Sequence, residues 1–180
     1  TKGISAVRSV RLILAIYHAI ICHRGIKMTR TSPIELTNMI MIENSKTHEI
    51  LVENRKNPNW PGVTFPGGHI ESGETVVASA IREAYEETGL MIENPQLVGI
   101  KEWPLTDGAR YIVMLFKATQ YHGTLQSGQE GDIFWTTRDE LRHMDTPRTF
   151  LDMLPVFDEL EINELALSDI YQGERTMTFL

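Results

Sequence analysis

The chain has 180 residues, 42% of them hydrophobic and 23% charged, a composition typical of one globular domain with a hydrophobic core. Its formal net charge of −7 argues against binding DNA or RNA through the phosphate backbone, because that requires a positive surface. A small phosphate ligand stays compatible with this charge if metal ions supply positive charge. The single cysteine, Cys22, has no partner for a disulfide or a CxxC zinc site, so we expect a reducing, cytoplasmic setting.

The first 27 residues form an N-terminal extension of uncertain status. They carry basic but no acidic residues, and residues 12–22, LILAIYHAIIC, form an apolar run. Three interpretations stay open: a helix or strand packing on the domain, a membrane-targeting element, or a translated upstream segment with Met28 as the natural start. His18 interrupts the run, which is well short of the roughly 20 residues that span a bilayer. We favour the upstream segment and expect no membrane attachment.

From residue 34 onward the sequence predicts strands separated by turn residues. Residues 34–44 and 48–56 are predicted to be two strands that form a hairpin, because the polar residues 44–47 between them are typical of a turn. Gly, Pro or Asp stands at the edges of the other strand candidates, which are residues 63–65, 97–103, 110–121 and 132–137.

Helical patterns are fewer than strand patterns. One covers residues 75–88, one begins near Thr137, and one lies within residues 148–165, where Pro155 should break or open it. Because the strands outnumber the helices and do not alternate with them regularly, we expect an α+β domain with a mixed sheet.

The predicted helix 75–88 gathers three carboxylates on one side. Glu83, Glu86 and Glu87 are three and four residues apart, a spacing at which like charges repel by a few tenths of a kcal/mol per pair. A solvated surface is one explanation of this acidic side. Gly89 is expected to end the helix. The opposite side, expected to face the core, consists of Val77, Ile81, Ala84, Tyr85 and Thr88.

The segment before this helix gives the carboxylates a second explanation. Residues 65–74, FPGGHIESGE, place Gly67 and Gly68 directly after a strand. Glycines permit close backbone approach, so the loop can fold back on the helix and aim a carbonyl at a ligand that the carboxylates hold. Oxygen ligands without His or Cys suit a hard cation, Mg²⁺ or Mn²⁺, which would cancel the repulsion and leave positions for water and phosphates.

The spacing of these residues resembles the signature of the Nudix hydrolase family. Gly68 is followed after five residues by Glu74, and after seven more by residues 82–90, REAYEETGL. Every charged and glycine position matches, and Ala84 is smaller than the usual branched aliphatic residue. The FPGG phrase and strand order resemble the MutT-like branch, over about residues 35–141. The resemblance implies an α/β/α sandwich around a mixed sheet, within a single Nudix hydrolase domain at residues 28–180.

The resemblance also implies a metal site. It gives Glu83, Glu86 and Glu87 as the metal-binding carboxylates and Gly67 as the source of a ligating backbone carbonyl, with Mg²⁺ or Mn²⁺ as cofactor. Arg82 matches the arginine that orients the first glutamate, and its alternative role is a surface ion pair with Glu86.

Further acids and one histidine belong to the same comparison. Glu74 matches an isolated acid whose role is either structural or direct. Glu130, in a Gly-flanked loop, is the candidate for a further metal ligand or general base, with Asp132 as the alternative. Glu83, Arg82 and Glu130 are thus the candidate catalytic residues. His69 is expected to be an exposed loop residue.

The implied reaction is hydrolysis of a nucleoside diphosphate linked to another group. The similarity favours an oxidised purine triphosphate such as 8-oxo-dGTP, cleaved to monophosphate and pyrophosphate. ADP-ribose, dinucleoside polyphosphates and capped RNA are alternatives, as is a nucleotide-sensing module without turnover. The expected partner is a small nucleotide and not a nucleic-acid duplex, and a homodimer is allowed. The aromatic residues that could stack on a base, or equally belong to the core, are Trp60, Phe65, Trp103 and Tyr111.

Overall fold

The computed structural model describes residues 31–128, 131–169 and 175–180. Within this part of the chain, Pro33–Leu180 form one compact unit. The interpretations of residues 1–27, and of Glu130, lie outside the described residues. None of the helices in the described ranges combines the length and the apolar character that crossing a membrane would require.

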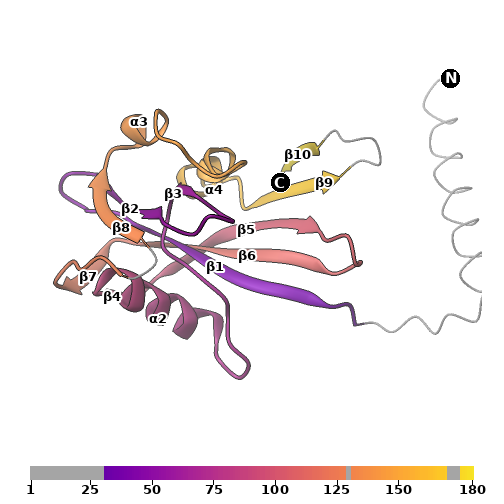
Figure 1. Cartoon of the computed structure of the whole chain (residues 1–180), viewed down its shortest axis with the longest axis horizontal. Coiled ribbons are helices and arrows are strands. Elements are labelled where there is room, and N and C mark those ends of the chain that lie inside the picture. Colours follow the sequence, from indigo (N-terminus) through magenta and orange to yellow (C-terminus); the bar gives the residue numbers. More distant parts are fainter. Residues whose placement is uncertain (1–30, 129–130, 170–174) are drawn as a thin grey trace, which may run out of the picture. The chain divides into compact units, whose positions relative to one another are not determined.

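A five-stranded mixed sheet is the centre of the fold (Figure 1). β1 pairs with β6 and β5 with β9 in parallel, whereas β6 pairs with β5 and β9 with β10 in antiparallel fashion. The mixture confirms the expected α+β class with a mixed sheet. In sheet order, the strands are β1 (Ile34–Ile42), β6 (Arg110–Ala118), β5 (Gln96–Pro104), β9 (Glu164–Asp169) and β10 (Arg175–Phe179).

Two smaller antiparallel sheets accompany the central one. The first has the order β3-β2-β8, and the second pairs β4 with β7. Their strands are β2 (Ile50–Arg55), β3 (Gly62–Thr64), β4 (Leu90–Glu93), β7 (Gln120–Gly123) and β8 (Gly131–Thr136).

The predicted hairpin of residues 34–44 and 48–56 is wrong. β1 and β2 are joined by an isolated bridge between Glu43 and Ile50 and then continue into different sheets. The turn residues determine only the local reversal of the chain. Consecutive residues at the end of β1, from Ile40 to Ile42, are fully buried, which is typical of a strand covered on both faces and paired in parallel.

Helices cover both faces of the central sheet, as Figure 1 shows for α2 on one face and α4 on the other. Ile40 and Ile42 of β1 belong to the hydrophobic cluster that includes α2, whereas Met41 belongs to the cluster that includes α4. Side chains alternate between the two faces of a strand, so β1 contributes to both clusters. The expected sandwich is confirmed. Its helices are α2 (Val76–Thr88), α3 (Arg138–Leu141), a 3-10 turn (Leu151–Met153) and α4 (Leu154–Asp158).

Helix α2 begins and ends as predicted, but its buried face is rotated. The Thr75 hydroxyl accepts a hydrogen bond from the Ala78 amide, and Gly89 closes the helix in the left-handed conformation at φ 72. Val77 and Tyr85, expected in the core, are exposed, whereas Glu87 is only 6% exposed. Ala84 and Thr88 are buried as predicted, and Ser79 and Ala80 are buried as well, because small residues let the helix lie close to the sheet.

Charged side chains anchor the turn between β1 and β2. The buried Glu43 carboxylate accepts hydrogen bonds from Arg138 and Lys117, each at 2.9 Å, and lies 3.1 Å from His48 Nδ1. Burial raises the pKa of Glu43, but the hydrogen bonds from Lys117, Arg138 and His48 outweigh burial and lower the pKa to about 2. Arg138 also binds Asp158 at the end of α4, at 2.8 Å. The network therefore links β1 to both α3 and α4.

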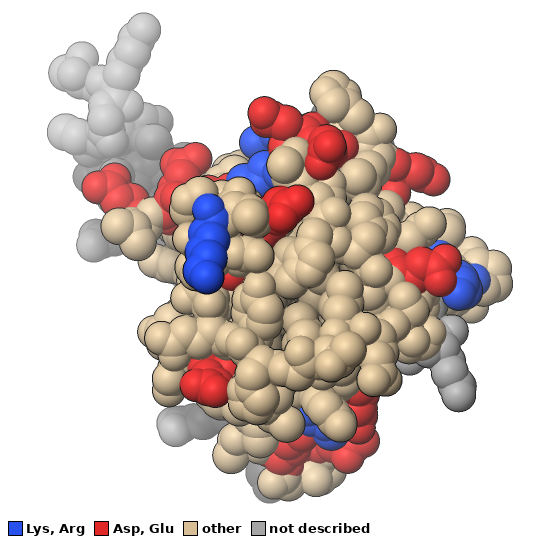
Figure 2. Space-filling model, turned by 90° about the vertical axis from the view of Figure 1, so that its left-hand side faces the viewer, with Lys and Arg blue, Asp and Glu red and all other residues tan. Residues whose placement is uncertain are grey.

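The face drawn in Figure 2 carries its charges in small, scattered groups of red and blue on a largely uncharged surface. On this face the blue side chains do not form a continuous basic patch. Such a patch is what binding to nucleic-acid phosphates through counterion release requires.

Replacing Glu43 with Gln should lower the free energy of unfolding at pH 7 by about 1–3 kcal/mol, because Lys117 and Arg138 lose their buried anionic partner. The native pKa of about 2 lies below the ordinary 4.5, so this stabilisation is complete above about pH 4.5 and is lost as the pH falls toward 2. Urea denaturation should therefore show the stabilities of wild type and Glu43→Gln converging in this interval.

The exposed Glu159→Gln is the matched control, expected to change stability little at any pH. A difference between wild type and Glu43→Gln that stays constant from pH 7 to pH 2 would contradict the assignment.

Candidate active site

The glycine-containing segment 66–70 lies antiparallel along the outer edge of β1. The amide of Asn38 donates to the Gly68 carbonyl at 2.9 Å, and the amide of Ile40 donates to the Pro66 carbonyl at 2.8 Å. The Ile70 amide donates back to Leu36 at 3.1 Å. This segment, called the glycine strip below, is therefore fixed to the central sheet by backbone hydrogen bonds.

Gly67 joins the glycine strip to α2. Its amide donates to Oε2 of Glu87 at 2.8 Å. Its backbone has φ 154, a value that side chains rarely allow, and a Cβ at this position would overlap the carbonyl oxygen of Asn38. Both constraints require glycine. The amide of Gly67 therefore faces the helix, and the buried Glu87 carboxylate has a donor that compensates its burial.

Gly68 makes room for the second carboxylate. A Cβ built on Gly68 would lie 2.5 Å from Oε1 of Glu83. The Glu83 carboxylate thus packs directly on the backbone of the glycine strip. Two of the three predicted carboxylates, Glu83 and Glu87, lie against successive glycines.

Arg82 neutralises the acidic side of α2. Its guanidinium donates to both oxygens of Glu74, at 3.0 and 2.9 Å, to Glu83 at 2.9 Å and to Glu86 at 3.1 Å. It also donates to the carbonyl of His69, at 3.1 Å, and so contacts the glycine strip. The hydrogen bond with Glu74 is the largest of the effects that raise the pKa of Arg82, and the same bond lowers the pKa of Glu74. Arg82 is therefore more than a surface partner of Glu86.

Glu86 does not converge with the other two acids. Its side chain is 57% exposed, and it does not line the cavity that Glu83 and Glu87 share. Among the described residues, which exclude residues 129–130, no three His, Cys, Asp or Glu side chains form a group that could hold a metal ion. Glu83 and Glu87 are nevertheless hard oxygen donors beside the glycine backbone, a chemistry that fits a hard cation such as Mg²⁺.

The remaining predicted polar residues have different surroundings. Glu74 holds Arg82 with both carboxylate oxygens and accepts the Glu71 amide at 3.2 Å, which supports a structural role. His69 is exposed as expected, and its Nε2 lies 3.0 Å from Glu35. Asp132, the alternative to Glu130, is exposed and pairs with Lys56 at 2.9 Å.

A cavity of about 540 Å³ joins the carboxylates to aromatic side chains. Trp103 and Tyr111 in its lining are stacked, with ring centres 4.3 Å apart and an angle of 10° between the planes. Burial raises the pKa of Tyr111, so its hydroxyl stays neutral. The predicted residues that line this cavity are Trp60, Gly67, Glu83, Glu87, Trp103 and Tyr111.

The prediction that Phe65 stacks on a base is wrong. Phe65 is 2% exposed and makes edge contacts with Phe150 and Phe157 in the hydrophobic core. Its side chain, directly after β3, packs toward α4 and the 3-10 turn before it, so the core alternative holds for this residue.

Sequence reasoning missed three cations in the cavity lining, Arg55, Lys101 and Arg148. Lys101 had a usable signal, because it is two residues from Trp103 in a predicted strand and so lies on the same strand face. Arg148 is in a loop, where nothing in the sequence distinguishes it from an ordinary surface arginine.

Comparison with known proteins identifies a family. The family model for the NUDIX domain matches residues 35–155, more than half of the chain. A Bacillus subtilis protein named as an uncharacterized Nudix hydrolase, YvcI, is 32% identical over 114 residues, which cover 61% of this chain and 69% of that protein. An ADP-ribose pyrophosphatase of Methanocaldococcus jannaschii is 34% identical over 87 residues, 47% of this chain and 52% of that protein.

The fold has solved counterparts as well. The MutT protein of Bacillus halodurans superposes with a TM-score of 0.63 and 21% sequence identity, covering 81% of this chain and 97% of that one. At this level of identity the likeness concerns the fold.

The Arg82–Glu74 pair should show strong energetic coupling. We expect a double-mutant cycle with Arg82→Met and Glu74→Gln to give a larger coupling free energy than an exposed ion pair gives, because the pair is bidentate and its side chains are less exposed. The more exposed pair of Lys56 and Asp132 is the matched control, with an expected coupling below about 1 kcal/mol. Equal coupling in the two cycles, measured by urea denaturation, would show that Arg82 is an ordinary surface arginine.

Proposed function

This chain belongs to the Nudix family, and from that premise we propose that it is a divalent-metal-dependent pyrophosphohydrolase of nucleoside diphosphates linked to a further group. The observation that carries the proposal is the shared cavity, which has Glu83 and Glu87 in its lining together with Trp60, Trp103 and Tyr111. Carboxylates suit a cation that binds phosphates, and aromatic faces suit a nucleobase. A sensing module without turnover would not need both carboxylates packed on the glycine strip.

The residues proposed to hold the metal are Glu83, Glu87 and the Gly67 carbonyl, with Glu86 as a ligand after it leaves Arg82. When bound, the divalent cation neutralises charge on the phosphate oxygens and activates a water for attack on phosphorus. Arg82 orients Glu83 through their 2.9 Å contact. The Gly67 amide holds Glu87 through one oxygen.

We propose Glu130 as the base that accepts the proton of the attacking water. Glu130 directly precedes β8 in the sequence, and β8 pairs with β2, the strand that also pairs with β3 before the glycine strip. Asp132 is the weaker alternative, because its carboxylate is exposed and bound to Lys56.

For the substrate we propose a purine nucleoside triphosphate, including oxidised forms such as 8-oxo-dGTP, cleaved to monophosphate and pyrophosphate. The sequence similarity to the MutT-like branch supports this choice. ADP-ribose is the second candidate, supported by the 34% identity with an ADP-ribose pyrophosphatase over 87 residues. Both are small nucleotides, and a cytoplasmic setting agrees with the single cysteine.

The test is hydrolysis of 8-oxo-dGTP, dGTP and ADP-ribose with Mg²⁺ or Mn²⁺, read as phosphate release after coupling to pyrophosphatase or phosphatase. Glu87→Gln keeps the acceptor for the Gly67 amide but removes a charge, so kcat should fall about 100- to 1,000-fold. The exposed Glu93→Gln is the control and should leave kcat unchanged. Full activity in excess EDTA, or no substrate turned over faster by wild type than by Glu87→Gln, would refute the hydrolase.

Gly68→Ala should impair turnover through displacement of Glu83. The added methyl would lie 2.5 Å from the carboxylate, and displacements of this kind in an active site lower rates by about a hundredfold. Gly73→Ala in the same loop is the matched control, because its Cβ would meet no atom within 4 Å. It should cost some stability, from its φ of 87, but preserve kcat. Equal loss of kcat in both variants would show a general loop effect.

A further inference from the structure

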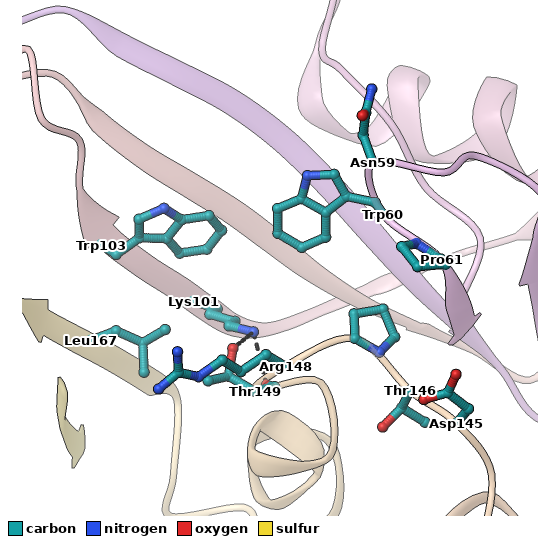
Figure 3. A pocket seen from close by; sticks show the side chains of 11 residues that line it. Asn59, Trp60, Pro61, Lys101, Trp103, Asp145, Thr146, Arg148, Thr149 and Leu167 are labelled. Carbon is teal, nitrogen blue, oxygen red and sulfur yellow. Dashed lines mark hydrogen bonds between the residues drawn. The ribbon is translucent and has the colours of Figure 1, made fainter. Parts of the chain in front are cut away.

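A second cavity, of about 410 Å³, adjoins the one that contains the carboxylates (Figure 3). The two cavities have five lining residues in common, which are Trp60, Lys101, Trp103, Pro147 and Arg148. The lining of the second cavity includes neither Glu83 nor Glu87. The shared residues therefore connect the two cavities, so a nucleotide whose phosphates lie at the carboxylates has room to extend past them into the second cavity.

Two indole rings form the walls of this second cavity. In Figure 3 Trp60 and Trp103 stand on either side of an open space, Trp60 on the loop after β2 and Trp103 on β5. Trp103 is backed by its stacked neighbour Tyr111, so its ring is held in a fixed plane. Trp60 is exposed on its loop. The accessible ring of Trp60 suits the stacking of a flat aromatic ligand, and the fixed ring of Trp103 limits the space beside it.

Lys101 fixes the loop below the two rings. This lysine is 8% exposed, and its Nζ donates to the carbonyl and the hydroxyl of Thr149 at 2.8 and 2.9 Å. Thr149 has φ 65, a left-handed conformation that is a genuine outlier for a β-branched residue. Strained backbone of this kind persists only where its surroundings enforce it, and the two hydrogen bonds from Lys101 do so.

The neighbouring Arg148 is thereby presented to the cavity. Its side chain is on the exposed surface and lines both cavities. Figure 3 shows it extending along the floor, below the space between Trp60 and Trp103 and toward Leu167. A guanidinium is a donor without any acceptor, so it binds carbonyl oxygens and is unfavourable beside an amino group.

We propose that the second cavity is a specificity subsite for 6-keto purines, in which the base stacks on the accessible ring of Trp60, beside Trp103, and Arg148 donates a hydrogen bond to O6. The inference rests on the proposed nucleotide hydrolysis and names the residue that selects the base. Adenine carries an amino group at position 6, which offers Arg148 no acceptor in its place. Lys101 is a positioning residue that acts through Thr149.

The sharpest substrate pair is dITP and dATP, whose bases differ in having a keto or an amino group at position 6. Wild type should show a higher kcat/KM for dITP. Arg148→Met should lower kcat/KM for dITP about tenfold to a hundredfold, the scale of one arginine contact to a purine, and change that for dATP about twofold at most. Arg148→Lys keeps a cationic donor and should restore part of the preference.

Arg142→Met is the matched control. Arg142 is also exposed, lies in the same connection after α3, and does not line either cavity. Because it too is an arginine, its replacement by Met changes the net charge by the same amount. Arg142→Met should leave the ratio of kcat/KM for dITP to kcat/KM for dATP unchanged. A wild type that prefers dATP, or an Arg148→Met variant with the wild-type ratio, would overturn the proposal.

Binding of the products separates this inference from the proposed hydrolysis. Binding of dIMP and dAMP can be measured without turnover, from quenching of tryptophan fluorescence. Wild type should bind dIMP more tightly than dAMP, and Arg148→Met should remove this margin. If that margin is present but no triphosphate is hydrolysed, the hydrolase proposal fails and the subsite stands. If triphosphates are hydrolysed and the margin is absent, the subsite fails alone.

The positioning role of Lys101 has its own readout. Lys101→Met removes both hydrogen bonds to Thr149 and should raise KM for dITP with little change in kcat, because Arg148 is no longer held in place. Adding Thr149→Gly to Lys101→Met should recover part of the dITP preference, since glycine adopts a left-handed backbone without strain. If Lys101 were purely structural, Lys101→Met would instead lower kcat and raise KM for dITP and dATP alike. That result would contradict the positioning role.

Discussion

The hydrogen bond between the Gly67 amide and the Glu87 carboxylate is the constraint on which the site depends. A carboxylate that is 6% exposed requires donors, and this donor comes from a strip of chain bound to β1. The bond therefore sets the separation of α2 from the edge of the central sheet. At that separation the backbone of Gly68 contacts Glu83; only glycine fits at position 67, and a side chain at position 68 would displace the Glu83 carboxylate.

Arg82 supplies the second condition, because the carboxylates that α2 holds close together repel one another and a cation offsets this repulsion. It is placed at the centre of Glu74, Glu83 and Glu86, and it reaches the glycine strip through the His69 carbonyl. In the network around Glu43 the charges are reversed, because two cations, Lys117 and Arg138, surround one carboxylate. That network holds the end of β1 to α3 and α4.

The sequence predicted the local parts of the site well, because they depend on neighbours in the chain. The helix from Thr75 to Gly89, and the glycine strip before it, are read from short-range spacing. The hairpin of β1 and β2 was wrong because the partner of β1 is decided by burial on both of its faces, which no turn residue reveals. The inward rotation of Glu87 and the contribution of Arg148 were missed for the same reason, since each depends on segments far away in sequence.

The two edges of β1 differ in how soon they can form during folding. The glycine strip pairs Asn38 with Gly68, a fairly local contact, whereas the parallel partner places Ile34 opposite Arg110. Closing the longer loop costs more chain entropy, and parallel pairing of distant strands is a slow step. A nascent chain that ends at Leu90 already contains both carboxylates and both glycines, yet β6 is still missing from the sheet that supports them. The signature is thus synthesised early, but it becomes a rigid site only when the later strands have docked.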